Sequence, residues 1–204
     1  MAKLDHIMWA CADLDQGTEE IADLTGARPA PGGSHPGMGT RNALLSLGDD
    51  QYLEIIAPDP SQDLSGTTGE LLLARGGSGI RSWAVATTDL IALAGLAQNA
   101  GYGHKDIIDM SRTTPEGLHL AWQLRFLTGN SLLPFFIDWK ASTHPALSTP
   151  KGCSLLEFCV FTEDIDAYQQ LMNALDLDLS MTKGSDYFKA TLQTPKGCVE
   201  LSNW

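Results

Sequence analysis

A strand-like apolar stretch that runs into an aspartate, and then into a helical pattern, occurs three times along the chain. The copies read LDHIMWACADL from Leu4, IRSWAVATTDL from Ile80 and LLEFCVFTEDI from Leu155, so they follow at intervals of 76 and 75 residues. The aspartate stands where a helix N-cap belongs, because its carboxylate can accept the free N–H groups of the first helical turn. The pattern predicts a strand followed by a helix in each copy.

Further elements follow each of these aspartates. Apolar residues spaced by three and four predict helices over residues 15–25, 90–100 and 165–175. Pairs of strand-like segments parted by turn residues come next, at 43–47 and 52–56, 118–126 and 133–139, and 187–192 and 199–202. A weaker strand is expected between each helix and its hairpin, at residues 27–31, 103–110 and 178–182. The repeated unit is therefore β-α-β-β-β.

This repetition predicts an α+β fold made of βαβββ modules. We place the modules at residues 1–58, 80–145 and 150–204, within one compact domain of residues 1–204. Two modules side by side would form an open barrel with a cavity. The third module would extend the barrel or pair with another chain.

Composition narrows the classes of partner. The 204 residues carry 13 basic and 25 acidic side chains, a formal net charge of −12, without a basic cluster. Nucleic acid and anionic membranes are therefore poor candidates, because both need clustered Lys and Arg. The chain contains no run of 18 apolar residues, so no transmembrane helix is expected, and the first residues lack the apolar core of a signal peptide. We expect a cytoplasmic protein with a small-molecule ligand.

The first module contains a polar pair in apolar strands. His6 lies in its first strand and Glu54 in its last, where a carboxylate within Tyr-Leu-Glu-Ile-Ile needs a partner, a proton or a metal. Imidazole and carboxylate are suitable ligands for a divalent cation. The last-strand acid recurs as Asp138 and Glu200, whereas Ser82 takes the place of His6 in the second module. The sequence predicts His6, Glu54 and Asp138 as metal ligands, and leaves a structural role for the pair open.

A glycine-rich segment is the other unusual feature. Residues 32–42, GGSHPGMGTRN, hold four glycines, which let backbone approach a ligand closely. No Gly-Lys-Ser/Thr follows, so no nucleotide cofactor is expected. A plain surface loop and a loop that brings His35 over the cavity both stay open, and His144 is expected at the surface or in a turn. The residues expected to bind a substrate in the cavity are Met8, Asn42, Tyr52 and Trp122.

The blocks LDHIMWACADLD, GGSHPGMGTRNALLSLG and YLEIIAP together resemble the glyoxalase-like domain family of the vicinal oxygen chelate (VOC) superfamily. The resemblance is most specific over residues 4–58 and looser over 80–145. It implies paired modules around a U-shaped cavity, in which metal-using members take His, Gln or Glu ligands from the first and last strands of both modules. His6 and Glu54 match that pattern, Asp138 matches as a shorter acid, and Ser82 departs from the usual histidine.

Two functions are consistent with these residues. In the first, Zn, Ni, Mn or Fe on His6, Glu54 and Asp138 chelates a vicinal-oxygen substrate, and Glu54 and His35 move a proton, as in a glyoxalase-type lyase or isomerase. In the second, the same cavity binds or sequesters a small molecule without metal. Replacing Glu54 by Gln separates the two. The superfamily resemblance also suggests a homodimer.

Overall fold

The computed structural model describes residues 2–114 and 117–204. Its helices are α1 (Leu14–Thr25), α2 (Thr68–Arg75), α3 (Leu90–Asn99) and α4 (Ile165–Ala174), with a 3-10 turn η1 (Pro145–Leu147). None of the helices in these ranges is long and apolar enough to cross a membrane. The strands are β1 (Lys3–Cys11), β2 (Ala30–His35), β3 (Thr40–Ser46), β4 (Tyr52–Pro58), β5 (Ser78–Ala86), β6 (Gly103–His104), β7 (Ile108–Thr113), β8 (His119–Thr128), β9 (Phe135–Asp138), β10 (Ser154–Thr162), β11 (Ser180–Lys183), β12 (Tyr187–Thr194) and β13 (Gly197–Ser202).

The three predicted helix starts are confirmed by their caps. The Asp13 carboxylate accepts the backbone N–H of Gln16 at 2.9 Å. Asp89 and Asp164 cap α3 and α4 in the same way. Helix α1 ends at Gly26, whose φ of 78° is left-handed and suits a residue without Cβ. Helix α2, in the segment between the first two modules, has no counterpart in the sequence prediction.

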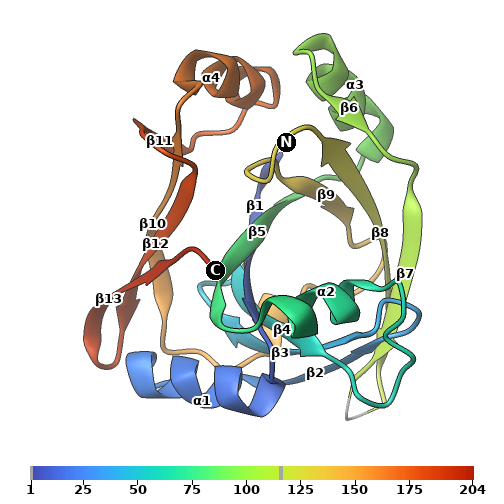
Figure 1. The fold of residues 1–204 in the computed structure, drawn as a ribbon, viewed down its shortest axis with the longest axis vertical. Helices are drawn as coiled ribbons and strands as arrows, with labels where there is room; N and C mark the ends of the chain where they lie inside the picture. Colours follow the sequence, from blue (N-terminus) through green and yellow to red (C-terminus); the bar gives the residue numbers. More distant parts are fainter. Residues whose placement is uncertain (1, 115–116) are drawn as a thin grey trace.

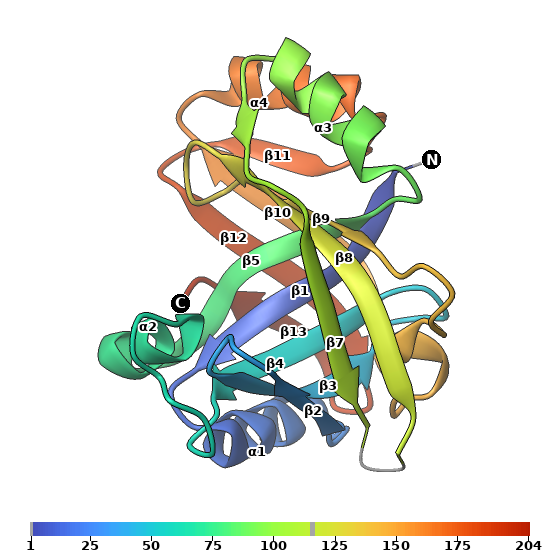
Figure 2. The same ribbon diagram turned by 90° about the vertical axis from the view of Figure 1, so that its right-hand side faces the viewer.

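The first two modules share one curled sheet, as predicted. The strand order is β2-β3-β4-β1-β5-β9-β8-β6, with β7 also paired to β8. At the centre β1 and β5 run antiparallel, and His6 faces Ala84 while Met8 faces Ser82. A shift of 76 residues turns the first of these pairs into the second, so the sequence repeat corresponds to a two-fold relation between the modules. Figures 1 and 2 show the sheet curling into a half-barrel.

Glycines let the two outer strands of this sheet approach one another. Gly33 has a φ of 135°, and a Cβ there would lie 2.8 Å from the carbonyl oxygen of Thr113 in β7. A side chain at this position would force β2 away from β7. Residues 32–35 of the glycine-rich segment belong to strand β2 and residues 40–42 to β3, so most of the segment is strand and not the loop that we expected. His35, at the end of β2, lines the cavity, as one of the two expectations had it.

The third unit has the predicted element order but a different strand order. Its sheet runs β11-β10-β12-β13, and β10 pairs in parallel with the next strand, β11, whereas β1 pairs in parallel with β4. Its apolar face packs on the barrel: Phe158 lies 5.6 Å from Trp83 between ring centroids. The hydroxyl of Tyr168 donates to the Leu132 carbonyl at 2.6 Å. This sheet therefore covers the face of β1 and β5 that points away from His6 and Met8.

Candidate functional site

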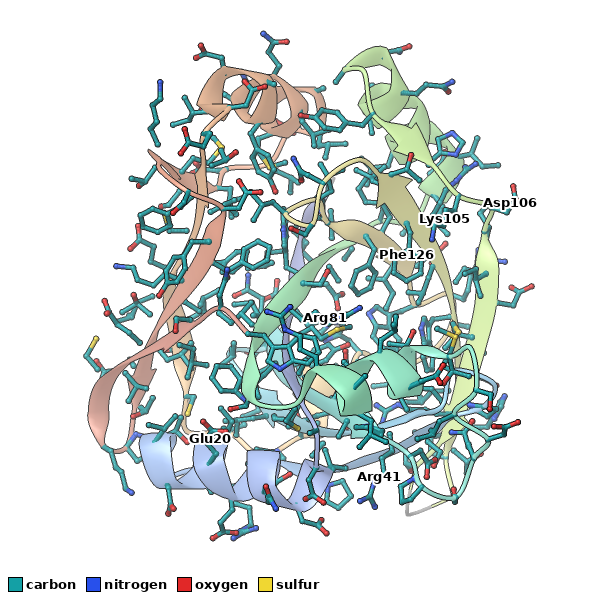
Figure 3. The ribbon with its side chains drawn as sticks, in the orientation of Figure 1. Glu20, Arg41, Arg81, Lys105, Asp106 and Phe126 are labelled. Carbon is teal, nitrogen blue, oxygen red and sulfur yellow. The ribbon has the colours of Figure 1, made fainter. Side chains whose placement is uncertain are left out.

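The curled sheet encloses a cavity of about 500 Å³. Because strand residues alternate in direction, every second side chain of β1, β4, β8 and β9 faces inward, whereas Ile80, Arg81 and Ser82 of β5 all line the cavity at a register shift in its ladder with β1. In Figure 3, Phe126 of β8 and Arg81 of β5 lie toward the middle of the view, whereas Lys105 and Asp106 lie at its edge. Apolar and aromatic side chains form most of the wall, and the polar side chains of β1 to β4 and β7 make up one part of it, which we call the polar end. The polar lining residues from β1 to β4 and β7 are His6, His35, Thr40, Asn42, Glu54 and Arg112.

Parallel pairing of β1 with β4 positions the polar end. The register places His6 opposite Tyr52 and Met8 opposite Glu54, so all four side chains face the cavity. The imidazole of His6 stacks on the Tyr52 ring at a centroid distance of 4.5 Å. The His6 Nε2 atom lies 3.6 Å from Glu54 Oε2. The predicted pair is thus brought together by neighbouring strands.

A second layer of polar groups holds this pair. The His6 Nδ1 atom lies 2.6 Å from the carboxylate of Asp5, which is fully buried. The same carboxylate accepts from Trp139 Nε1 at 3.0 Å and lies 3.1 Å from His144 Nε2. Burial alone would raise the pKa of Asp5, but the hydrogen bonds from His144 and His6 lower it well below the ordinary carboxyl value. Since Asp5 is ionised it accepts the Nδ1 proton of His6, and this contact directs Nε2 toward Glu54 and the cavity.

His35 supports Glu54 through Asn42. The Asn42 amide donates to Glu54 Oε1 at 2.6 Å and lies 3.2 Å from His35 Nε2. Burial lowers the pKa of His35, although the nearby Glu54 opposes the shift, so the ring is neutral at pH 7. Its Nδ1 is 3.0 Å from Thr40 Oγ1. Both ring nitrogens of His35 are therefore engaged with the protein, and Glu54 Oε2 is left for a ligand.

Asp138 does not join His6 and Glu54. Its neighbours Ile137 and Trp139 face the cavity, so its own side chain points to the other side of β9. There it accepts the backbone N–H of Lys140 and lies 3.0 Å from Lys140 Nζ. The predicted third metal ligand is therefore not in the site.

The strand register explains this error. Glu54 pairs with Met8, and Ala84, which follows Met8 by 76 residues, pairs with Phe135. Phe135, not Asp138, is thus the second-module equivalent of Glu54. Comparing the repeats by sequence alone placed the equivalent of Glu54 three residues too late, at Asp138, because the strands before it differ in length between the two modules.

The donor set does not fit the divalent metal that the resemblance implied. His6 Nε2 and Glu54 Oε2 are the two free donors of the first module, while the second module offers Ser82 and Phe135 at the corresponding positions. Catalytic metal centres of this kind take three protein ligands. Within residues 2–114 and 117–204, no group of three or more His, Cys, Asp or Glu side chains is placed to hold a metal ion.

The predicted substrate-binding residues Met8, Asn42, Tyr52 and Trp122 all lie on the cavity wall. Sequence reasoning missed Asp5, Arg112 and the contact of His144. Asp5 carried a usable signal, because a carboxylate inside an apolar central strand needs a partner just as Glu54 does. His144 lies at the start of a turn, as one of the two expectations had it, and from there its Nε2 contacts Asp5, 139 residues away in the sequence.

The curled sheet of two paired βαβββ modules around a cavity defines a member of the vicinal oxygen chelate superfamily. More particularly, the chain belongs to the glyoxalase-like domain family, whose model matches residues 4–176. No match is found among curated protein sequences.

Solved structures share the fold at low sequence identity. A hypothetical protein from Staphylococcus aureus is 19% identical with a TM-score of 0.69, and the match covers 100% of this chain and 89% of that chain. Methylmalonyl-CoA epimerase from Mycobacterium tuberculosis is 23% identical with a TM-score of 0.50, covering 67% of this chain and 87% of that chain. At these identities the comparison supports the fold alone.

Proposed function

We propose that this protein is an enzyme that moves a proton between two positions of a small carbonyl compound held in the barrel. The observation that carries the proposal is the pair His6 Nε2 and Glu54 Oε2, 3.6 Å apart at the polar end of the cavity. Among the described residues neither atom has a hydrogen-bond partner, because Asp5 holds the other nitrogen and Asn42 the other oxygen. Both atoms are thus available to a ligand.

Two basic atoms at one end of an apolar cavity suit acid–base chemistry. One can remove a proton from a carbon beside a carbonyl while the other, once protonated, returns a proton to a neighbouring position. The hydrogen bonds from Asn42 and to Asp5 fix both groups before the substrate arrives, which lowers the cost of reorganisation during the reaction. An isomerase is the reaction class that this arrangement supports. The fold shared with an epimerase makes this class the first to test.

The competing function is a binding or sequestering protein that uses the same cavity. In that case His6 and Glu54 only orient the ligand, and no bond to hydrogen is broken. The two functions differ in one observable, the exchange of carbon-bound hydrogen for deuterium in a bound carbonyl compound.

The test is NMR in D₂O on a panel of small aldehydes, ketones and 2-oxo acids, with the wild-type protein and the Glu54→Gln and Glu157→Gln variants. We expect exchange of at least one compound, slowed by about a hundredfold or more in Glu54→Gln. Glu157 is exposed on β10, so its variant should match the wild type.

Absence of exchange with every compound, or equal rates in Glu54→Gln and wild type, would contradict the proposal. A chelator is added in a second series. If the chelator abolishes exchange and the addition of one divalent metal restores it, the result supports the metal-dependent mechanism instead.

A further inference from the structure

The cavity contains a buried positive charge that the proposed proton transfer does not use. Arg112 lies on β7 opposite Leu120 of β8 and lines the cavity, with 5% of its surface exposed. Its Nη1 is inaccessible to solvent and has no hydrogen-bond partner. A guanidinium keeps its charge in proteins, so burying it without an acceptor is costly. We therefore expect a bound molecule, and not one of the described side chains, to pair with the Arg112 guanidinium.

No carboxylate of the described residues satisfies Arg112. None lies within 4.0 Å of its guanidinium. Burial lowers the pKa of Arg112, and the nearby Glu54 carboxylate acts in the opposite direction, so Glu54 lies in the neighbourhood of the guanidinium without pairing with it. Glu54 Oε1, however, accepts from Asn42, and Oε2 lies 3.6 Å from His6 Nε2, so neither oxygen forms an ion pair with Arg112. The protein thus provides no carboxylate for Arg112, and since this residue lines the cavity, a ligand there can meet the part of the guanidinium that faces it.

Asn42 cannot neutralise this charge. Its Oδ1 is buried and also without a partner. A Cβ at position 32 would collide both with Asn42 Oδ1 and with Arg112 Nη1, so the two unsatisfied atoms lie close together against Gly32. A neutral amide oxygen can accept one N–H but supplies no charge. An anionic group is the complement that the guanidinium requires, and a planar carboxylate matches it with two parallel hydrogen bonds.

The other side chains that line the cavity indicate what the uncharged part of such an anion would be. Four aromatic side chains from β8, β9 and the residue after β9 form a wall, namely Trp122, Phe126, Phe135 and Trp139. Arg75 and Arg81 also line the cavity, beside the Trp204 ring, as do the carboxylates of Glu54 and Asp186. Arg75 donates to the Trp204 carbonyl and Arg81 lies over the Trp204 ring, which leaves Arg112 as the arginine that an anion would pair with.

We infer that the ligand is a small organic acid with an apolar, aromatic-sized body, whose carboxylate binds Arg112. The inference names the substrate class of the proposed proton transfer and rests on that function for its catalytic meaning. The cavity of about 500 Å³ has room for a ligand of this size. The carboxylate at Arg112 brings the atoms next to it to the polar end, where His6 and Glu54 lie.

The test compares acids with alcohols of the same body by calorimetry at millimolar concentration. The probes are benzoate and benzyl alcohol, 3-phenylpropionate and 3-phenylpropan-1-ol, and indole-3-acetate and indole-3-ethanol. In the wild type we expect at least one acid to bind about tenfold or more tightly than its alcohol, because a charged hydrogen-bonded pair replaces a neutral contact. Arg112→Gln should abolish this preference and leave the alcohol unchanged, and Arg112→Lys should keep part of it.

The matched control is Arg125→Gln. Arg125 lies on β8, its Nε donates to the Lys105 carbonyl, and it does not line the cavity. This variant loses the same charge and should keep the full preference for acids. If no acid binds more tightly than its alcohol in the wild type, or if a folded Arg112→Gln keeps the preference, the inference is wrong. The comparison of acids with alcohols in the wild type needs no variant, so it tests the inference even if Arg112→Gln fails to fold.

Binding and exchange separate the two proposals. A preference for acids without deuterium exchange overturns the proposed proton transfer and leaves the carboxylate site standing. Exchange of neutral carbonyl compounds, with no preference for acids, supports the proton transfer and overturns the carboxylate site.

Discussion

Replacing Asp5 by Asn tests the network that holds His6. Asp5 is fully buried, and its two oxygens meet His6 Nδ1, Trp139 Nε1 and His144 Nε2 at 2.6, 3.0 and 3.1 Å. An asparagine keeps one acceptor oxygen and turns an N–H group toward the remaining partners. At least one buried donor of the network then faces another donor.

The expected cost follows from these contacts. One unpaired buried donor costs about 1–3 kcal/mol, and breaking a buried charged pair costs about 3–5 kcal/mol. We expect Asp5→Asn to lower the free energy of unfolding by about 3 kcal/mol. With a urea dependence of about 3 kcal/mol per molar for a chain of this size, the midpoint falls by about 1 M.

The assay is urea unfolding followed by circular dichroism, with Asp109→Asn as the control. Asp109 is exposed and accepts a single side-chain hydrogen bond, from Gln123 at 2.7 Å, so its variant should shift the free energy of unfolding by less than about 0.5 kcal/mol. A midpoint for Asp5→Asn as close to wild type as that of Asp109→Asn would refute the reasoning.

The pH dependence gives a second check on Asp5. Its pKa in the folded protein lies below the ordinary value of 3.8. The unfolded chain therefore binds the proton more readily, and the stabilisation is present above pH 3.8 and lost as the pH falls toward the folded pKa. The gap between wild type and Asp5→Asn should be full at pH 6 and close in acid.

Two further predictions concern residues 33 and 35. Burial holds the pKa of His35 below 6.5, so the unfolded state takes up a proton first and the free energy of unfolding falls as the pH drops below 6.5. In His35→Gln the urea midpoint should therefore change less between pH 7.5 and 5.5 than it does in the wild type. Gly33→Ala should lower the melting temperature more than Gly37→Ala, because both have positive φ but a Cβ at position 37 meets nothing within 4 Å; equal melting temperatures would contradict the close approach of β2 to Thr113.

The sequence by itself determined the repeated local structure. Asp13, Asp89 and Asp164 cap the helices as predicted, because N-capping depends on a few adjacent residues. The interval of 76 residues also identified β1 and β5 as equivalent strands, which the structure pairs in one antiparallel ladder. The pair His6 and Glu54 could be predicted because a carboxylate in an apolar strand needs a partner.

Only the tertiary structure decided which side chains meet. Strand alternation turns Asp138 away from the cavity and Phe135 toward it. A shift of one residue in the strand register exchanges the two faces of a strand, so sequence spacing across loops of different length cannot decide which of the two residues faces the cavity. The contact of Asp5 with His144, and the position of Arg112 in the cavity, depend on strands far apart in the chain. The third unit repeats the order of elements but pairs β10 with β11, because strand neighbours are set by packing on the barrel and not by element order.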